Sequence, residues 1–149
     1  AQPKIENRAN RLDFERLWVF SAGIHKFEND HLHPGRQAVV YQDLGLIKSL
    51  IKQGVKIERI VALLDQDATR ENCRKELTAL LQGSKKGDSL LVFAHSHGSA
   101  NRGGLICTYE TGGVWEFADL IEIIENNFNG SRACICVCAC HSGSLIDQI

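Results

Sequence analysis

Four short apolar runs alternate along this chain with segments in which apolar residues recur at helical spacing. The apolar runs, which are typical of buried strands, cover residues 17–20, 57–64, 89–94 and 133–139. The helical segments between them cover residues 43–53, 69–82 and 117–128. Strands that alternate with helices in this way form a parallel sheet with helices on both faces. The chain is therefore predicted to be an α/β protein with a mostly parallel sheet, of which it supplies four strands.

The segments outside this alternation are assigned by their turn residues and their charge. Gly112 and Gly113 separate two short β-prone runs within residues 105–115, which predicts a small hairpin after the third strand. Residues 1–16 hold seven charged side chains and are expected to form a polar lead-in. Residues 17–149 then form one domain, since a length of 149 residues is that of a single domain.

Charge and hydropathy exclude two classes of partner. The chain has 17 basic and 18 acidic residues, so it has no positive excess with which to bind a nucleic-acid backbone. No apolar run approaches the roughly 18 residues of a membrane-spanning helix. We therefore expect neither a nucleic-acid partner nor a membrane partner.

Six cysteines are present, and four of them occupy alternate positions between residues 134 and 140. Neighbouring cysteines of this kind lie on one face of a strand about 7 Å apart, which is poor geometry for a disulfide. We interpret Cys134, Cys136 and Cys138 as small apolar residues that fill one face of the sheet. Unpaired thiols fit a reducing compartment, and the cytoplasm is the predicted location.

Two strand ends carry groups that could act together in catalysis. The third strand runs into His97 and Gly98, and the fourth runs into Cys140. Sites of open α/β sheets lie at the carboxyl ends of the strands, so an imidazole and a thiol from these ends can meet. A neighbouring imidazole takes the proton of a thiol and makes it a nucleophile. We predict Cys140 as the nucleophile, His97 as general base and acid, and the backbone amides of Gly98 and Cys140 as the oxyanion hole.

These segments resemble those of the caspases and metacaspases. Residues 91–98 (LVFAHSHG) resemble the segment of that family in which an apolar strand ends in His-Gly, and residues 138–143 (CACHSG) resemble the metacaspase Cys-His-Ser-Gly segment. The histidine precedes the cysteine by 43 residues, against a spacing of about 50 in caspases. Asp43 resembles the Asp that opens the family's first helix. The resemblance covers roughly residues 17–145 and implies a caspase-like fold and a cysteine endopeptidase that works through a thioester acyl-enzyme.

Two departures from the family pattern bear on substrate and assembly. Metacaspases that cut after Arg or Lys have an Asp two residues before the nucleophile, where this chain has Cys138. A basic P1 preference is therefore not expected, whereas Arg36 lies near the place of an S1-pocket arginine in caspases. The family's sheet has six strands, and only four are predicted here. The end of this chain is similar to that of a processed large subunit, so a small subunit from the same precursor is an expected partner, beside a protein or peptide substrate.

Several alternatives stay open at this stage. The His and Cys residues lack the two- to four-residue gap of paired zinc ligands, so we expect no metal cofactor. Asp65 and Asp67 follow the second strand and could bind calcium, which some metacaspases need, although a turn and helix-cap role is simpler. A catalytically silent caspase-like scaffold, which binds a partner through its sheet edge, has the same motifs. A cysteine-dependent acyltransferase would use the same dyad.

Overall fold

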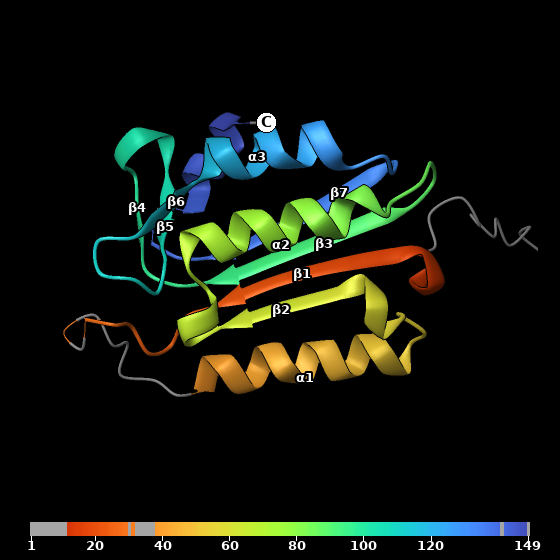
Figure 1. The fold of residues 1–149 in the computed structure, drawn as a ribbon, viewed down its shortest axis with the longest axis horizontal. Helices are drawn as coiled ribbons and strands as arrows, with labels where there is room; N and C mark the ends of the chain where they lie inside the picture. Colours follow the sequence, from red (N-terminus) through yellow and green to blue (C-terminus); the bar gives the residue numbers. More distant parts are fainter. Residues whose placement is uncertain (1–11, 30, 32–37, 141, 149) are drawn as a thin grey trace, which may run out of the picture.

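A four-stranded parallel sheet forms the centre of the protein. The computed structural model describes residues 12–29, 31, 38–140 and 142–148. The strands of the sheet, in spatial order, are β2 (Ile60–Leu64), β1 (Leu17–Gly23), β3 (Ser89–His95) and β7 (Arg132–Cys138). Every neighbouring pair is parallel, and the arrows of β1, β2 and β3 point the same way in Figure 1. The predicted α/β class with a four-stranded parallel sheet is confirmed.

In the described residues, three α-helices cover this sheet. α1 (Ala38–Lys52) packs on one face, whereas α2 (Arg70–Gln82) and α3 (Phe117–Asn127) pack on the other. Side chains of β1 alternate between the two cores, with Val19 under α1 and Phe20 under α2 and α3. This position explains why the first apolar run has no polar face. None of the described helices is long and apolar enough to cross a membrane.

α2 begins and ends where the sequence predicts. Thr69 is its N-cap, and the side-chain oxygen of Thr69 accepts a hydrogen bond from the Asn72 N–H at 3.2 Å. Gly83 is its C-cap. The buried face consists of four residues at helical spacing, namely Cys73, Leu77, Leu80 and Leu81. Because these apolar residues recur at intervals of three and four, the periodicity alone defines which side of the helix meets the sheet.

β7 is an edge strand that is covered on one face only. The inner side chains along this segment pack against the core beneath α2 and α3; they are Ile135, Val137 and Ala139. Cys134, Cys136 and Cys138 share the opposite face, as predicted, but all three are exposed. The prediction that they fill a packed face is wrong for the described part of the chain. The reason is that α1 covers the other strands, and no β7 side chain belongs to the core under α1.

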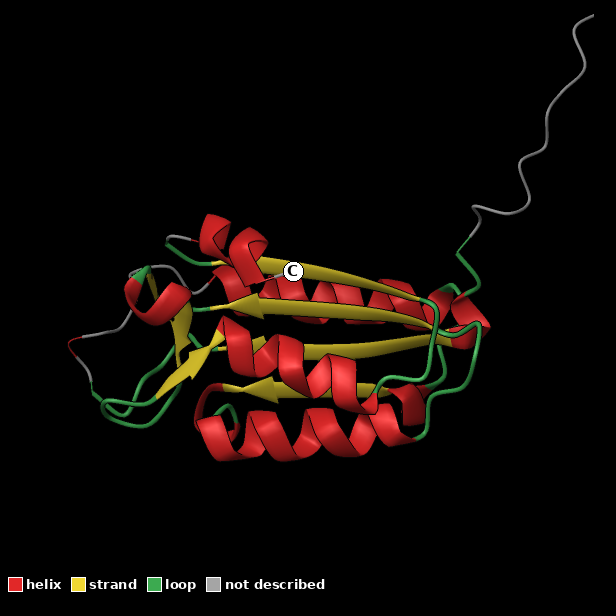
Figure 2. Cartoon of the chain, turned by 90° about the horizontal axis from the view of Figure 1, so that it is seen from above, coloured by secondary structure: helices red, strands yellow, loops and turns green. Residues whose placement is uncertain are grey.

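A second, antiparallel sheet lies at the carboxyl ends of the parallel strands, as Figure 2 shows. It consists of β4 (Gly98–Ser99), β5 (Leu105–Cys107) and β6 (Val114–Glu116), with β5 in the middle. The predicted hairpin between β5 and β6 is confirmed. β4 was not predicted, because a strand of two residues is too short to show a period. This second sheet matters for function because β4 follows directly on His97.

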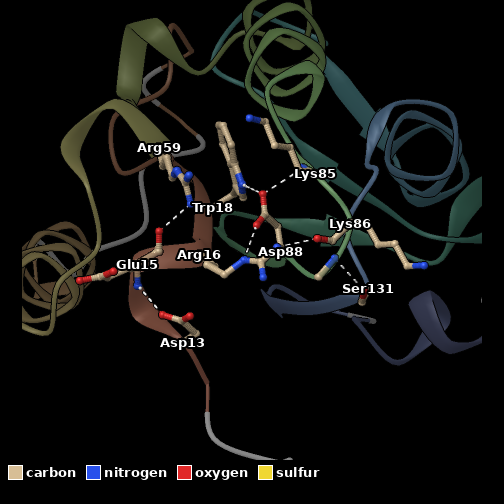
Figure 3. Close-up of polar contacts among 10 residues, drawn as sticks. Asp13, Glu15, Arg16, Trp18, Arg59, Lys85, Lys86, Asp88 and Ser131 are labelled. Atoms are coloured by element: carbon tan, nitrogen blue, oxygen red, sulfur yellow. Dashed lines mark hydrogen bonds and ion pairs between the residues drawn. The ribbon is translucent and has the colours of Figure 1, made fainter.

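Asp88, a buried carboxylate just before β3, joins several segments at the opposite end of the sheet (Figure 3). The Trp18 indole N–H and the Lys85 backbone N–H donate to its Oδ2 at 2.8 and 2.9 Å, and the Arg16 guanidinium donates to its Oδ1 at 3.0 Å. Burial raises the pKa of the Asp88 carboxyl, but the hydrogen bonds from Trp18, Lys85 and Arg16 outweigh burial and leave the pKa below its usual value. The last residue of the predicted lead-in, Arg16, is thus bonded to the folded domain.

Candidate active site

His97 lies at the carboxyl edge of the parallel sheet, between β3 and β4. Its carbonyl oxygen accepts a hydrogen bond from the Cys107 N–H in β5 at 2.8 Å, so the second sheet fixes its backbone. Its ring stacks on that of Phe27, with the ring centroids 5.5 Å apart and the planes at 28°. Phe27 is buried in the core under α2 and α3 and forms a rigid support. The half-buried imidazole of His97 therefore has a defined position near the surface.

Cys140 lies two residues beyond β7, and its thiol is exposed. Two contacts join its segment to the one that carries the histidine. The Ser96 N–H donates a hydrogen bond to the Cys138 carbonyl oxygen at 3.3 Å. Gly98 packs against the backbone so closely that a Cβ on Gly98 would overlap the Cys140 carbonyl oxygen. Glycine permits this approach, so the two segments that the sequence predicted to carry the dyad are in contact.

The expected oxyanion donors belong to the same two segments. Gly98 opens β4 and is paired with Ile106 in the β5 ladder, while Cys140 lies in the turn after β7. Backbone amides that are fixed by secondary structure need little reorganisation when charge develops on a substrate oxygen.

A second histidine at this edge has a partner that sequence reasoning missed. His95 Nδ1 lies 2.6 and 2.8 Å from the two carboxylate oxygens of Asp43 in α1. Gly23, at the end of β1, leaves room for this carboxylate, because a Cβ on Gly23 would lie 3.0 Å from Asp43 Oδ2. One signal could have revealed the pair. Asp43 shares the inner face of α1 with Ile47 and Leu50, where a carboxylate needs a partner.

The other two substrate-binding candidates are placed differently. Arg36 lies outside the described residues. Cys138 is the last residue of β7, exposed on the outer face, and it is paired in register with His95. No acidic side chain therefore occupies this position of the strand.

Asp65 has a backbone role at the end of β2. Its Oδ1 accepts hydrogen bonds from the N–H groups of His25 and Lys26 at 2.7 and 2.8 Å. Its φ of 48° is left-handed, and residues Asp65–Asp67 form a helical turn before α2, so the predicted turn role is confirmed. Within the described ranges, no group of three or more His, Cys, Asp and Glu side chains is arranged to hold a metal ion.

Two further thiols are less exposed than that of Cys140, since Cys73 is buried and Cys107 is partly buried. Burial, with a smaller effect of the Glu110 charge, raises the pKa of Cys73 to about 12. Burial also raises the pKa of Cys107. A raised pKa lowers the thiolate fraction at neutral pH, so these two cysteines are poor nucleophiles. The candidates for a reactive thiol are therefore the exposed cysteines of β7 and of the turn after it.

Comparison with known proteins yields a fold and no family. No protein-family model matches this chain, and no curated protein matches it. Among solved structures, the chain is similar to the crystal structure of protein GSU0716 from Geobacter sulfurreducens, with 15% identity and a TM-score of 0.62. The match covers 89% of this chain and 53% of that one, so this chain spans about half the length of the protein it matches. At this identity the likeness shows the α/β fold alone.

Proposed function

We propose that this chain carries the catalytic dyad of a cysteine endopeptidase of the caspase and metacaspase type. The observation that supports the proposal most directly is the packing of Gly98 on the backbone of Cys140, which brings the histidine segment against the cysteine segment. Phe27 orients the imidazole of His97, and the Cys140 thiol is open to a substrate. A thiol and an imidazole at the carboxyl edge of an α/β sheet are suited to covalent acyl transfer.

In the proposed reaction, His97 accepts the proton of the Cys140 thiol, and the thiolate attacks the carbonyl carbon of the scissile peptide bond. The backbone amides of Gly98 and Cys140 donate to the oxygen on which negative charge develops. His97 then protonates the leaving amine, and a thioester on Cys140 is left. The same imidazole deprotonates a water molecule, which hydrolyses the thioester and restores the thiol. These steps use only groups of this chain, the substrate and water.

For the substrate, we propose a protein or peptide without a strong preference for a basic P1 residue. Cys138 stands where an acidic residue would select Arg or Lys. Profiling of a peptide library varied at P1 tests this proposal, and a clear preference for Arg or Lys would contradict it. If Arg36 binds an acidic P1 residue, Arg36→Ala should remove cleavage after Asp and Glu while other cleavages persist.

For the location, we propose a reducing compartment such as the cytoplasm. All six cysteines are free, which supports this proposal.

We also propose that a small subunit from the same precursor completes the sheet beside β7. β7 is an edge strand, and its outer side chains are exposed. An uncovered edge offers N–H and C=O groups that can pair with another strand. The match to GSU0716 covers only 53% of that chain, so a protein of this fold has room for such a segment.

A catalytically silent scaffold of the same fold is the second candidate, and the exposed edge of β7 favours it. A partner that adds a strand to this edge would be bound by main-chain hydrogen bonds, without any use of the dyad. An acyltransferase would form the same thioester but pass the acyl group to an acceptor other than water. Peptide hydrolysis therefore distinguishes the peptidase from the other two, and a thioester on Cys140 distinguishes the acyltransferase from the scaffold.

Hydrolysis of fluorogenic peptides by the full-length protein tests the dyad. Cys140→Ala should abolish both hydrolysis and labelling by a thiol-directed peptide inhibitor, and His97→Ala should lower turnover by roughly 10²–10⁴-fold. Cys134→Ala is the matched control, because it removes an exposed cysteine from the same strand segment and should keep normal turnover. Normal hydrolysis by Cys140→Ala would contradict the assignment. If the unmodified protein shows neither hydrolysis across the whole library nor inhibitor labelling of Cys140, the scaffold is favoured.

A further inference from the structure

The three exposed thiols of β7 differ in what lies beside them on β3. Strand pairing places Cys134, Cys136 and Cys138 opposite Leu91, Phe93 and His95, in that order. In-register residues of parallel strands point to the same face, and the strands lie about 4.8 Å apart. Phe93 belongs to the core under α1, so His95, two residues later, is on that face as well. The Cys138 thiol therefore has an imidazole as its cross-strand neighbour, whereas the other two have apolar side chains.

His95 is arranged as a proton acceptor. Asp43 is buried, with 3% of its side chain exposed, and both of its carboxylate oxygens lie within 2.8 Å of His95 Nδ1. A carboxylate in this place orients the ring and holds a proton on Nδ1, so the lone pair of the neutral ring is on Nε2. The imidazole is 21% exposed, so the ring, and not the carboxylate, is the part of the pair that a neighbour can reach. The order carboxylate, imidazole, thiol is the one that activates nucleophilic cysteines.

We propose that Cys138 is a second reactive thiol, activated by the His95–Asp43 pair, and that it is a modification site for small disulfides and alkylating electrophiles. His95 Nε2 accepts the thiol proton, and the thiolate attacks one sulfur of a low-molecular-weight disulfide, RSSR. The Cys138–S–S–R bond forms, the S–S bond of RSSR breaks, and the departing RS⁻ takes the proton from the imidazolium and leaves as RSH. Cys138 is oxidised in this step, and the small disulfide is reduced. An excess of RSH drives the same step backwards.

Two neighbours on the same strand serve as internal references. Cys134 and Cys136 are exposed on the same face as Cys138, and their sulfur atoms lie 3.9 Å apart. Burial is the main cause that raises the pKa of Cys136, followed by the effects of Cys134 and Cys138 beside it. Cys134, which lies opposite Leu91, is the better reference, because it matches Cys138 in strand and face but lacks the imidazole.

The test measures the rate of alkylation by iodoacetamide at each cysteine of the native full-length protein, with mass spectrometry to assign the site. Cys138 should react about tenfold faster than Cys134 at neutral pH. His95→Gln should slow Cys138 to the rate of Cys134 and leave Cys134 unchanged, whereas His97→Ala should leave Cys138 fast. With glutathione disulfide in place of iodoacetamide, the mixed disulfide should form at Cys138 before Cys134.

Equal rates at Cys138 and Cys134 in the unmodified protein would overturn the proposal, and this comparison requires no variant to fold. An unchanged Cys138 rate in folded His95→Gln would overturn it too. The proposal does not depend on peptidase activity. If the protein hydrolyses no peptide but Cys138 is alkylated rapidly, the proposed peptidase function is refuted while the proposed reactive thiol of Cys138 is supported.

Discussion

Replacing Asp88 with alanine is expected to lower the free energy of unfolding by about 3–5 kcal/mol. The residue is 3% exposed, and its carboxylate accepts hydrogen bonds from the Trp18 indole, the Lys85 backbone N–H and the Arg16 guanidinium. Truncation leaves the Trp18 and Lys85 donors without their acceptor, and each unpaired donor costs about 1–3 kcal/mol. The Arg16 side chain is 46% exposed, so the ion pair itself contributes only about 0–1 kcal/mol. The loss therefore comes mainly from the two donors inside the protein.

Urea unfolding, followed by tryptophan fluorescence, measures this free energy. Asp88→Asn is a graded variant, because the amide keeps one acceptor oxygen and should lose less than Asp88→Ala. Arg16→Ala removes only the exposed partner and should cost about 1 kcal/mol or less. A loss below about 1 kcal/mol for Asp88→Ala would refute the reasoning, because even one orphaned donor costs that much.

The pH dependence of stability gives an independent check on Asp88. The folded-state pKa of its carboxyl lies below the unfolded value of about 3.9. The ionised carboxylate therefore adds stability that is fully present above about pH 4, and that is lost as the pH falls through the folded-state pKa. The stability difference between the unmodified protein and Asp88→Asn should be constant at neutral pH and shrink in acid. If the stability difference between the two proteins stays the same in strong acid, the charge of Asp88 does not contribute to the free energy of unfolding.

Four further changes are expected to have defined results. Gly98→Ala should lower peptide turnover, because the new Cβ overlaps the Cys140 carbonyl oxygen. Gly45→Ala within α1 is the control, because a Cβ there meets nothing within 4 Å. This variant should keep normal turnover and raise the free energy of unfolding, measured with urea, by up to about 1 kcal/mol. Phe27→Leu keeps apolar bulk but removes the ring that stacks on the His97 imidazole, so kcat should fall with little change in KM if His97 acts as proposed. Equal loss in Phe27→Leu and Phe27→Tyr would argue against stacking. Leu77→Ala empties a fully buried site and should cost about 2–5 kcal/mol of unfolding free energy, and a cost below 1 kcal/mol would contradict the packing of α2 on the sheet. This chain expressed alone should self-associate through β7 in size-exclusion chromatography, and a downstream segment should relieve the association; a well-folded, fully active monomer would contradict the proposed subunit.

The parts of the fold that could be predicted from the sequence are those in which spacing along the chain determines burial. α2 is the clearest example, since Thr69, Gly83 and four apolar residues at helical intervals define its ends and its inner face. The exposure of the β7 cysteines could not be predicted in the same way. It depends on how far α1 extends across the neighbouring strands, and the composition of β7 contains no information about that distance.

In the candidate site, too, some residues could be predicted from the sequence and others required the structure. His97 and Cys140 are found from the sequence because each follows an apolar run, and parallel strands bring their carboxyl ends together. The pairing of His95 with Asp43 joins residues 52 positions apart and needs the packing of α1 on β3. A sequence pattern identifies which residues share one element, whereas a contact between a helix and a strand requires the tertiary arrangement.

The position of β1 has a consequence for how this protein is made. Among the strands of the parallel sheet, β1 leaves the ribosome before β2, β3 and β7, yet it lies between two partners, and Leu17 pairs with Ser89, 72 residues later. At about 5–20 residues per second, synthesis of that stretch takes roughly 4–14 s. During this time a strand that is buried along all seven residues in the finished protein has one side unpaired. Until β3 emerges, chaperones and other nascent copies can bind the unpaired edge of β1. The rate of translation across residues 65–95 therefore sets the time during which misassembly competes with folding.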